Sequence, residues 1–73
     1  DENRPEPALT LLLQATKENP LRQDIHRRVM TLYSDLGRRS EAASHFKKMK
    51  SSLDNADLGL EKETEQLYSK LMS

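Results

Sequence analysis

Two amphipathic stripes that meet at a glycine constrain this chain more than any other feature of its sequence. The first stripe repeats every three or four residues from Leu21 to Leu36, which is typical of a helix buried along one side. The second repeats in the same way from Ala42 to Leu53. The stripes consist of Leu21, Ile25, Val29, Leu32, Tyr33 and Leu36, and of Ala42, Phe46, Met49 and Leu53. Because Gly37 between them readily ends a helix in the left-handed conformation, the sequence predicts a helical hairpin that crosses closely at Ala42.

A further helix is predicted upstream of this hairpin, and its apolar face is broad. It begins near Pro5 or Glu6, since proline and an acidic residue suit a first helical turn. It ends around Glu18, because the residue before Pro20 is pushed out of the helical conformation. Its buried face is expected to comprise Ala8, Leu11, Leu12 and Ala15, widened by Leu9 and Leu13. One neighbouring helix would not cover so wide a face, so we expect a second neighbour.

Local signals place the remaining helices. Asn19 is expected to cap the second helix, with Pro20 as its first residue. The expected spans are 20 to 36 or 37, 39 or 40 to about 53, and about 62 to 72, with a turn over 55–59. The last helix carries Thr64, Leu67, Tyr68, Leu71 and Met72 on one side. Four helices with short connections predict an all-α fold of antiparallel helical hairpins.

Length and composition exclude several classes of protein. The chain has 73 residues, which is one small domain, with residues 1–5 expected as a linker or loop and 6–73 as a helical module from a larger protein. Acidic and basic residues number 12 each, and there is no cysteine, which excludes a disulfide framework and thiolate zinc sites. No apolar run reaches the ~20 residues that span a membrane. A cytoplasmic protein is therefore expected.

The hairpin spacing is similar to that of the tetratricopeptide repeat, a helical hairpin about 34 residues long. Gly37 makes the turn, Ala42 lets the helices approach, and Phe46 fills the gap beside it, while His26 stands where the repeat usually has tryptophan. A shift of 34 residues places Ala8, Leu12, Ala15 and Pro20 on Ala42, Phe46, Met49 and Asp54. The chain is thus predicted to hold about one and a half tetratricopeptide-like repeats and a terminal helix.

A second resemblance covers residues 6 to 72. The pieces that carry it are Pro20-Leu21-Arg22, Ile25-His26-Arg27, Gly37-Arg38-Arg39, Glu41-Ala42, Leu58-Gly59-Leu60-Glu61 and Leu67-Tyr68. In this order and spacing they resemble the bacterial transcriptional activator domain, a tetratricopeptide-like module of antibiotic-pathway and response-regulator-type transcriptional regulators. One departure is that Lys62-Glu63-Thr64 stands where the family usually has a proline-rich cap. The start of the last helix therefore rests on weaker signals than the others.

The resemblance implies a function in transcription regulation. In that family the module follows a winged-helix DNA-binding domain and helps the regulator to dimerise or to contact the transcription machinery. Its expected partners are thus its own DNA-binding domain, a second subunit or the transcription machinery, with DNA contacted only by a domain outside this chain. The alternative is a generic tetratricopeptide adaptor without a link to transcription.

Four residues are predicted to bind a protein partner. Leu9 and Leu13 widen the apolar face of the first helix and are expected to dock a neighbour, while Arg38 and Arg39 at the hairpin turn could meet an acidic partner. No glycine-rich phosphate loop, nucleophile elbow or metal-binding pair is visible. We therefore expect no enzyme activity, no catalytic residues, no cofactor and no metal site.

Two further interpretations compete with this one. In the first, basic residues form a surface whose affinity for DNA falls with salt. Zero net charge and three aromatic residues on buried stripes favour solvated helix faces instead. The basic residues are Arg22, Arg27, Arg28, Arg38, Arg39, Lys47, Lys48 and Lys50. His26 is interpreted as a packed or half-exposed histidine in the position of an aromatic residue, not as a metal ligand. His45 is interpreted as an exposed partner of Glu41 one turn earlier.

Overall fold

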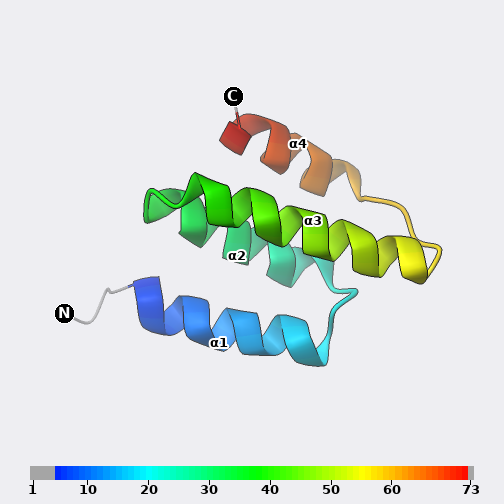
Figure 1. The fold of residues 1–73 in the computed structure, drawn as a ribbon, viewed down its shortest axis with the longest axis horizontal. Helices are drawn as coiled ribbons and strands as arrows, with labels where there is room; N and C mark the ends of the chain where they lie inside the picture. Colours follow the sequence, from blue (N-terminus) through cyan, green and yellow to red (C-terminus); the bar gives the residue numbers. More distant parts are fainter. Residues whose placement is uncertain (1–4, 73) are drawn as a thin grey trace.

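The computed structural model describes residues 5–72, which form four helices that run alternately up and down (Figure 1). The helices are α1 (Pro5–Glu18), α2 (Gln23–Asp35), α3 (Arg39–Asn55) and α4 (Lys62–Met72). The predicted all-α fold is confirmed, and the observed bounds agree with prediction to within two residues everywhere except at the start of α2. Residues 1–4, where most of the linker was expected, lie outside the described part.

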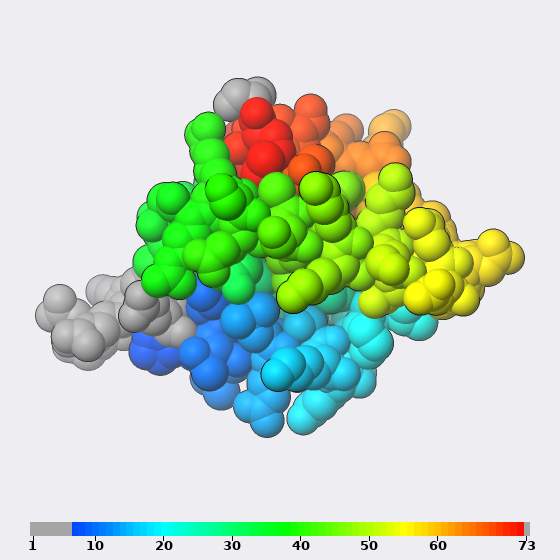
Figure 2. Space-filling view, viewed as in Figure 1, coloured from blue at the N-terminus to red at the C-terminus, as the bar shows by residue number. Residues whose placement is uncertain are grey.

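Helix α2 is the centre of the domain. It contacts α1, α3 and α4, whereas α1 contacts α2 alone among the described helices. In the space-filling view, α3 crosses the middle of the molecule between α1 and α4 (Figure 2). The fold is therefore a stack in which α1 lies at one end and α4 at the other.

The α2–α3 hairpin forms as the sequence predicts. Gly37 adopts a φ of +76°, and its N–H donates to the Ser34 carbonyl while the Arg38 N–H donates to the Tyr33 carbonyl. These two bonds satisfy the last carbonyls of α2 in the manner of a Schellman motif. The side chain of Ala42 is fully buried where α3 crosses α2, so its small size allows the close approach.

The start of α2 differs from prediction. Asn19 does not cap the helix; its carbonyl accepts a 3.1 Å hydrogen bond from the Arg22 N–H, which closes a turn over residues 19–22. Asparagine and proline suit the first two positions of such a turn as well as they suit a helix start. Helix α2 therefore begins three residues later than expected, at Gln23, and Leu21 is exposed in the turn.

The core lies between α2, α3 and α4. It is formed by the buried side chains of Met30, Ala42, Met49 and Leu53, with Tyr33, Phe46, Leu60, Leu67, Tyr68, Leu71 and Met72 packed around them. The rings of Phe46 and Tyr68 stack at 3.8 Å between centroids with an angle of 10°. The apolar stripes predicted on α3 and α4 thus face this core.

A polar cluster around the buried side chains of Gln23 and Thr64 joins α2 to α4. The Gln23 side-chain oxygen accepts hydrogen bonds from the Glu61 N–H and the Thr64 hydroxyl, both at 2.8 Å, and its amide donates to the Gly59 carbonyl at 3.0 Å. Arg27 donates to the Glu61 carboxylate at 2.7 Å and to the Thr64 oxygen at 3.1 Å. Gln23 thereby satisfies an N–H at the start of α4 that the helix itself cannot bond. We call these residues the Gln23 cluster.

Candidate interaction surface

Helix α1 leaves part of its apolar surface open, and this part differs from the predicted one. Leu11 was expected to be buried but is 69% exposed, and Ala8 is exposed as well. Leu9, predicted to dock a partner, is 4% exposed and is covered within the domain. Because six apolar residues encircle more than half of α1, their periodicity does not determine which side meets α2.

The buried side of α1 is instead centred on Leu9 and Thr16. A threonine can lie there because its hydroxyl donates to the Leu13 carbonyl at 2.7 Å, so no polar atom is left unsatisfied. Leu13 itself is half-buried. The apolar positions of α1 are thus divided between a side that packs on α2 and a side that stays open.

The internal repeat explains what this open side lacks. A shift of 34 residues places Ala8 on Ala42, and Ala42 is the fully buried residue where α3 crosses α2. The corresponding crossing helix is not among the described residues, so Ala8 and Leu11 face outward. This correspondence over 34 residues is the sequence signal from which the exposure of Leu11 could have been predicted. We call the surface formed by Ala8, Leu11 and Ala15 the open face of α1.

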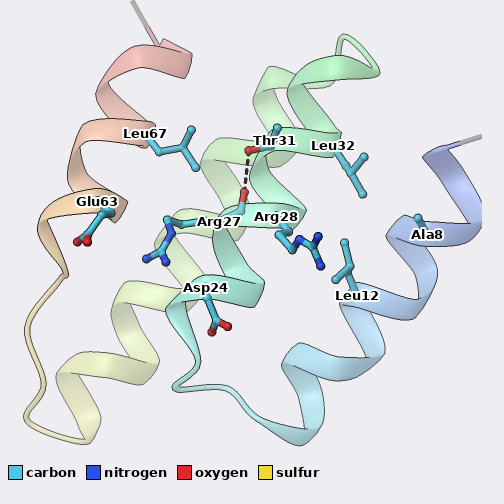
Figure 3. A pocket seen from close by; sticks show the side chains of 9 residues that line it. All are labelled: Ala8, Leu12, Asp24, Arg27, Arg28, Thr31, Leu32, Glu63 and Leu67. Carbon is cyan, nitrogen blue, oxygen red and sulfur yellow. Dashed lines mark hydrogen bonds between the residues drawn. The ribbon is translucent and has the colours of Figure 1, made fainter.

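A groove continues from this face across α2 to α4 (Figure 3). It has a volume of about 860 Å³, with α2 as its floor and α1 and α4 as its walls. Leu12 from α1, Leu32 from α2 and Leu67 from α4 supply its apolar lining. Sequence patterns did not predict this groove, because three separate helices contribute to it.

Charged side chains on the floor of the groove differ in whether they are already paired. Arg22 binds Asp24 at 2.7 Å, and these hydrogen bonds hold the pKa of the Asp24 carboxyl below its usual value. Arg27 is bonded to the Gln23 cluster. Arg28 is exposed and has no hydrogen-bond or ion-pair partner among residues 5–72. Within residues 5–72, the groove therefore presents one unpaired cation, Arg28.

A histidine pair lies on the other side of α2. His26 is buried, which is the packed alternative of the two predicted. Its Nε2–H donates to the Pro20 carbonyl at 2.7 Å, which leaves Nδ1 to accept from His45 Nε2 at 2.8 Å. The prediction that His45 is exposed beside Glu41 is wrong, because the ring is half-buried against His26. Burial, with lesser contributions from His26 and Lys48, lowers the pKa of His45 to about 4.

The two arginines predicted to meet an acidic partner lie at the other connection, between α2 and α3. Arg38 forms a 3.6 Å ion pair with Glu41, and Arg39 is exposed in the first turn of α3. These arginines lie at the start of α3, whereas Leu9 and Leu13 lie on α1, and α1 and α3 do not contact each other. The four predicted residues do not form one site.

The described residues show neither a metal site nor a membrane span. Within residues 5–72, no three His, Cys, Asp or Glu side chains come together as metal ligands would. None of the four described helices has the length and apolar character to cross a membrane. The surfaces available for a function in this part of the chain are thus the open face of α1, the groove, and the exposed helix sides.

Comparison with known proteins gives one match. The family model described as the bacterial transcriptional activator domain matches residues 1–72. Searches of curated proteins and of solved structures gave no match. The match spans all four helices, so it includes both the open face of α1 and the groove.

Proposed function

Because this chain belongs to the bacterial transcriptional activator domain family, we propose that it is the protein-binding module of a transcriptional regulator. It acts by seating a helix of another protein or domain, not by catalysis and not by contacting DNA itself. A winged-helix DNA-binding domain upstream would supply the contact with DNA. The partners are that domain, a second subunit or the transcription machinery.

The observation that carries this proposal is the unmatched half-repeat at α1. Its open face repeats the residues with which α3 packs on α2, yet Leu11 is 69% exposed. A tetratricopeptide-like stack buries its apolar surface only when each helix has its neighbour. A helix packed on α1 as α2 packs on α3 would complete the repeat. In the isolated chain, we expect a second copy to cover this surface.

Sedimentation velocity over a range of concentrations tests the proposal. The wild-type chain is expected to associate, and Leu11→Glu is expected to make it monomeric, because a charge replaces the most exposed leucine. Ser44→Glu adds the same charge at an exposed position on α3 and serves as the control. Helix content from circular dichroism should be equal in all three chains. A wild-type chain that stays monomeric at every concentration would contradict self-association through this face.

The domains that accompany this module provide a second test. Reading the gene through roughly 200 residues upstream of Asp1 covers one or two domains. Three helices followed by a hairpin with basic residues would identify a winged helix and support the regulator. A run of further 34-residue helical repeats without such a domain would instead favour a generic adaptor.

A further inference from the structure

We infer that the helix seated on α1 is an acidic amphipathic helix, whose apolar side chains enter the groove and whose carboxylate pairs with Arg28. This inference rests on the proposed function and adds the chemistry of the partner. It makes the groove and the open face of α1 one continuous binding surface.

The apolar lining matches one side of a helix. Leu12 lies next to the open face of α1, and Leu32 follows it on the adjoining side of α2 (Figure 3). α1 and α4 both pack on α2 without contacting each other, which leaves the side of α2 between them uncovered. An amphipathic helix is the element that brings apolar residues to one side at a three- or four-residue spacing.

The charges of the groove select an acidic partner. Asp24 and Arg27 are already neutralised, by Arg22 at 2.7 Å and by Glu61 at 2.7 Å. Arg28 points from the floor toward α1, the wall on which the partner helix would lie, whereas the carboxylate of Glu63 is directed away from α2 (Figure 3). The unpaired charge within reach of the partner is thus positive. A carboxylate opposite the Arg28 guanidinium would form a charge-assisted pair of hydrogen bonds.

The contact between α2 and α4 shows the same chemistry one repeat further on. Arg27 and Glu61 are separated by 34 residues, so they occupy the same position in successive repeats, and they form an ion pair. An acidic residue of the partner placed beside Arg28 would form a cation–anion pair of the same kind on this helix.

A synthetic peptide tests the inference on the whole 73-residue chain. The probe is an amphipathic helical peptide of about 15 residues, with leucine and alanine along one side and a single row of glutamate beside them. Binding is followed by chemical-shift changes in the isotope-labelled chain. We expect changes at Leu12 and Leu32, and about tenfold weaker binding for Arg28→Glu and for a peptide with glutamine in place of glutamate.

Two controls separate this contact from general electrostatic attraction. Lys47→Glu makes the same charge change on an exposed residue of α3 and should leave the affinity unchanged. A lysine peptide should bind Arg28→Glu better than it binds the wild-type chain, since the charges are then exchanged. Restored binding in this exchanged pair would support the pairing directly.

Other results would overturn the inference. Three results would each contradict an acidic helix as the partner. They are absence of binding up to about 1 mM peptide, equal affinity for the glutamate and glutamine peptides, and chemical-shift changes confined to α3. Binding of duplex DNA that depends on Arg28 and weakens steeply with salt would assign this arginine to nucleic acid. A monomeric chain that still binds the peptide through Arg28 would retain the groove while rejecting self-association, so the two proposals fail separately.

Discussion

The two ends of the helical stack are attached to α2 by different interactions. At the α4 end, the Gln23 cluster provides directional hydrogen bonds to α2, and the Phe46–Tyr68 stack joins α4 to α3. At the α1 end, no cross-helix hydrogen bond comparable to these joins the described parts of α1 and α2, and Leu9 supplies a buried apolar contact. The α4 end is therefore specified by geometry, and the α1 end by hydrophobic burial.

The outward surfaces of α1 and α4 also differ, in the polarity of their exposed residues. The exposed residues of α4 are all polar and comprise Lys62, Glu63, Glu65, Gln66, Ser69 and Lys70. Those of α1 include Ala8 and Leu11. A polar outer side is typical of a capping helix, whereas an apolar one needs a neighbour. One end of this domain is thus finished by its own polar residues, whereas the other end leaves apolar side chains exposed.

The largest effect is expected from Leu9→Asp. A carboxylate at this buried position is expected to destabilise the packing of α1 on α2 by about 3–5 kcal/mol, because it removes apolar contact and buries a charge. Since α1 contacts α2 alone, we expect α1 to detach while α2, α3 and α4 stay folded. Amide hydrogen exchange measures this helix by helix. Equal loss of protection in all four helices would show that the α1 end is not independent.

The next largest effect is expected from Gln23→Met. This change keeps the length of the side chain but removes the hydrogen bonds to Gly59, Glu61 and Thr64, and should lower the free energy of unfolding by about 2–3 kcal/mol. Gln14→Met is the matched control, because Gln14 is exposed on α1, and should change stability by less than about 0.5 kcal/mol. Urea denaturation gives both values. Similar losses of stability at Gln23 and Gln14 would contradict a special contribution of the Gln23 cluster to the α4 end.

A smaller effect is expected from acidification. The pKa of His45 is about 4 in the folded chain, below its ordinary 6.5, so the unfolded chain binds the additional proton between these values. Stability should therefore fall as pH decreases from 6.5 toward 4, by about 1–2 kcal/mol after allowance for solvent screening of a half-buried ring. Urea denaturation of wild type and His45→Asn at several pH values isolates the contribution of His45 to the pH dependence of stability. An identical pH dependence of the two chains would contradict it.

The histidine pair also extends the comparison of the two ends. His26 bonds to the Pro20 carbonyl in the α1–α2 connection, whereas the Gln23 cluster holds the α3–α4 connection with an amide, a hydroxyl and an ion pair. Each connection is thus tied to α2 by hydrogen bonds of its own.

The smallest effects are expected at the two helix ends that use the left-handed conformation. Gly37 and Asp57 have φ values of +76° and +59°, and each follows the last turn of its helix. Asp57→Gly should stabilise the chain by about 0.5–1 kcal/mol, and Gly37→Ala should destabilise it by about 1 kcal/mol. An added Cβ at Gly37 meets no atom within 4 Å, so the backbone alone accounts for the cost. Thermal unfolding checks both signs.

Local patterns predicted most of the fold because each depended on few residues close in the chain. Gly37 between two amphipathic stripes indicated the hairpin, and the polar break after Leu53 separated α3 from α4. The start of α2 could not be predicted in this way. Asn19-Pro20 is equally suited to a turn and to a helix start, and the Arg22 N–H decided between them by bonding to the Asn19 carbonyl.

By itself, the sequence determined the number and order of the helices, the α2–α3 crossing at Ala42 and the family of the domain. Only the tertiary structure decided which side of α1 is buried, that Gln23 serves the start of α4, and that Arg28 lies in a groove. The physical reason is that helical periodicity states which residues share a side, whereas the choice of side depends on neighbours distant in the chain. For α1, whose apolar residues encircle it, that choice exposed Leu11 and buried Leu9.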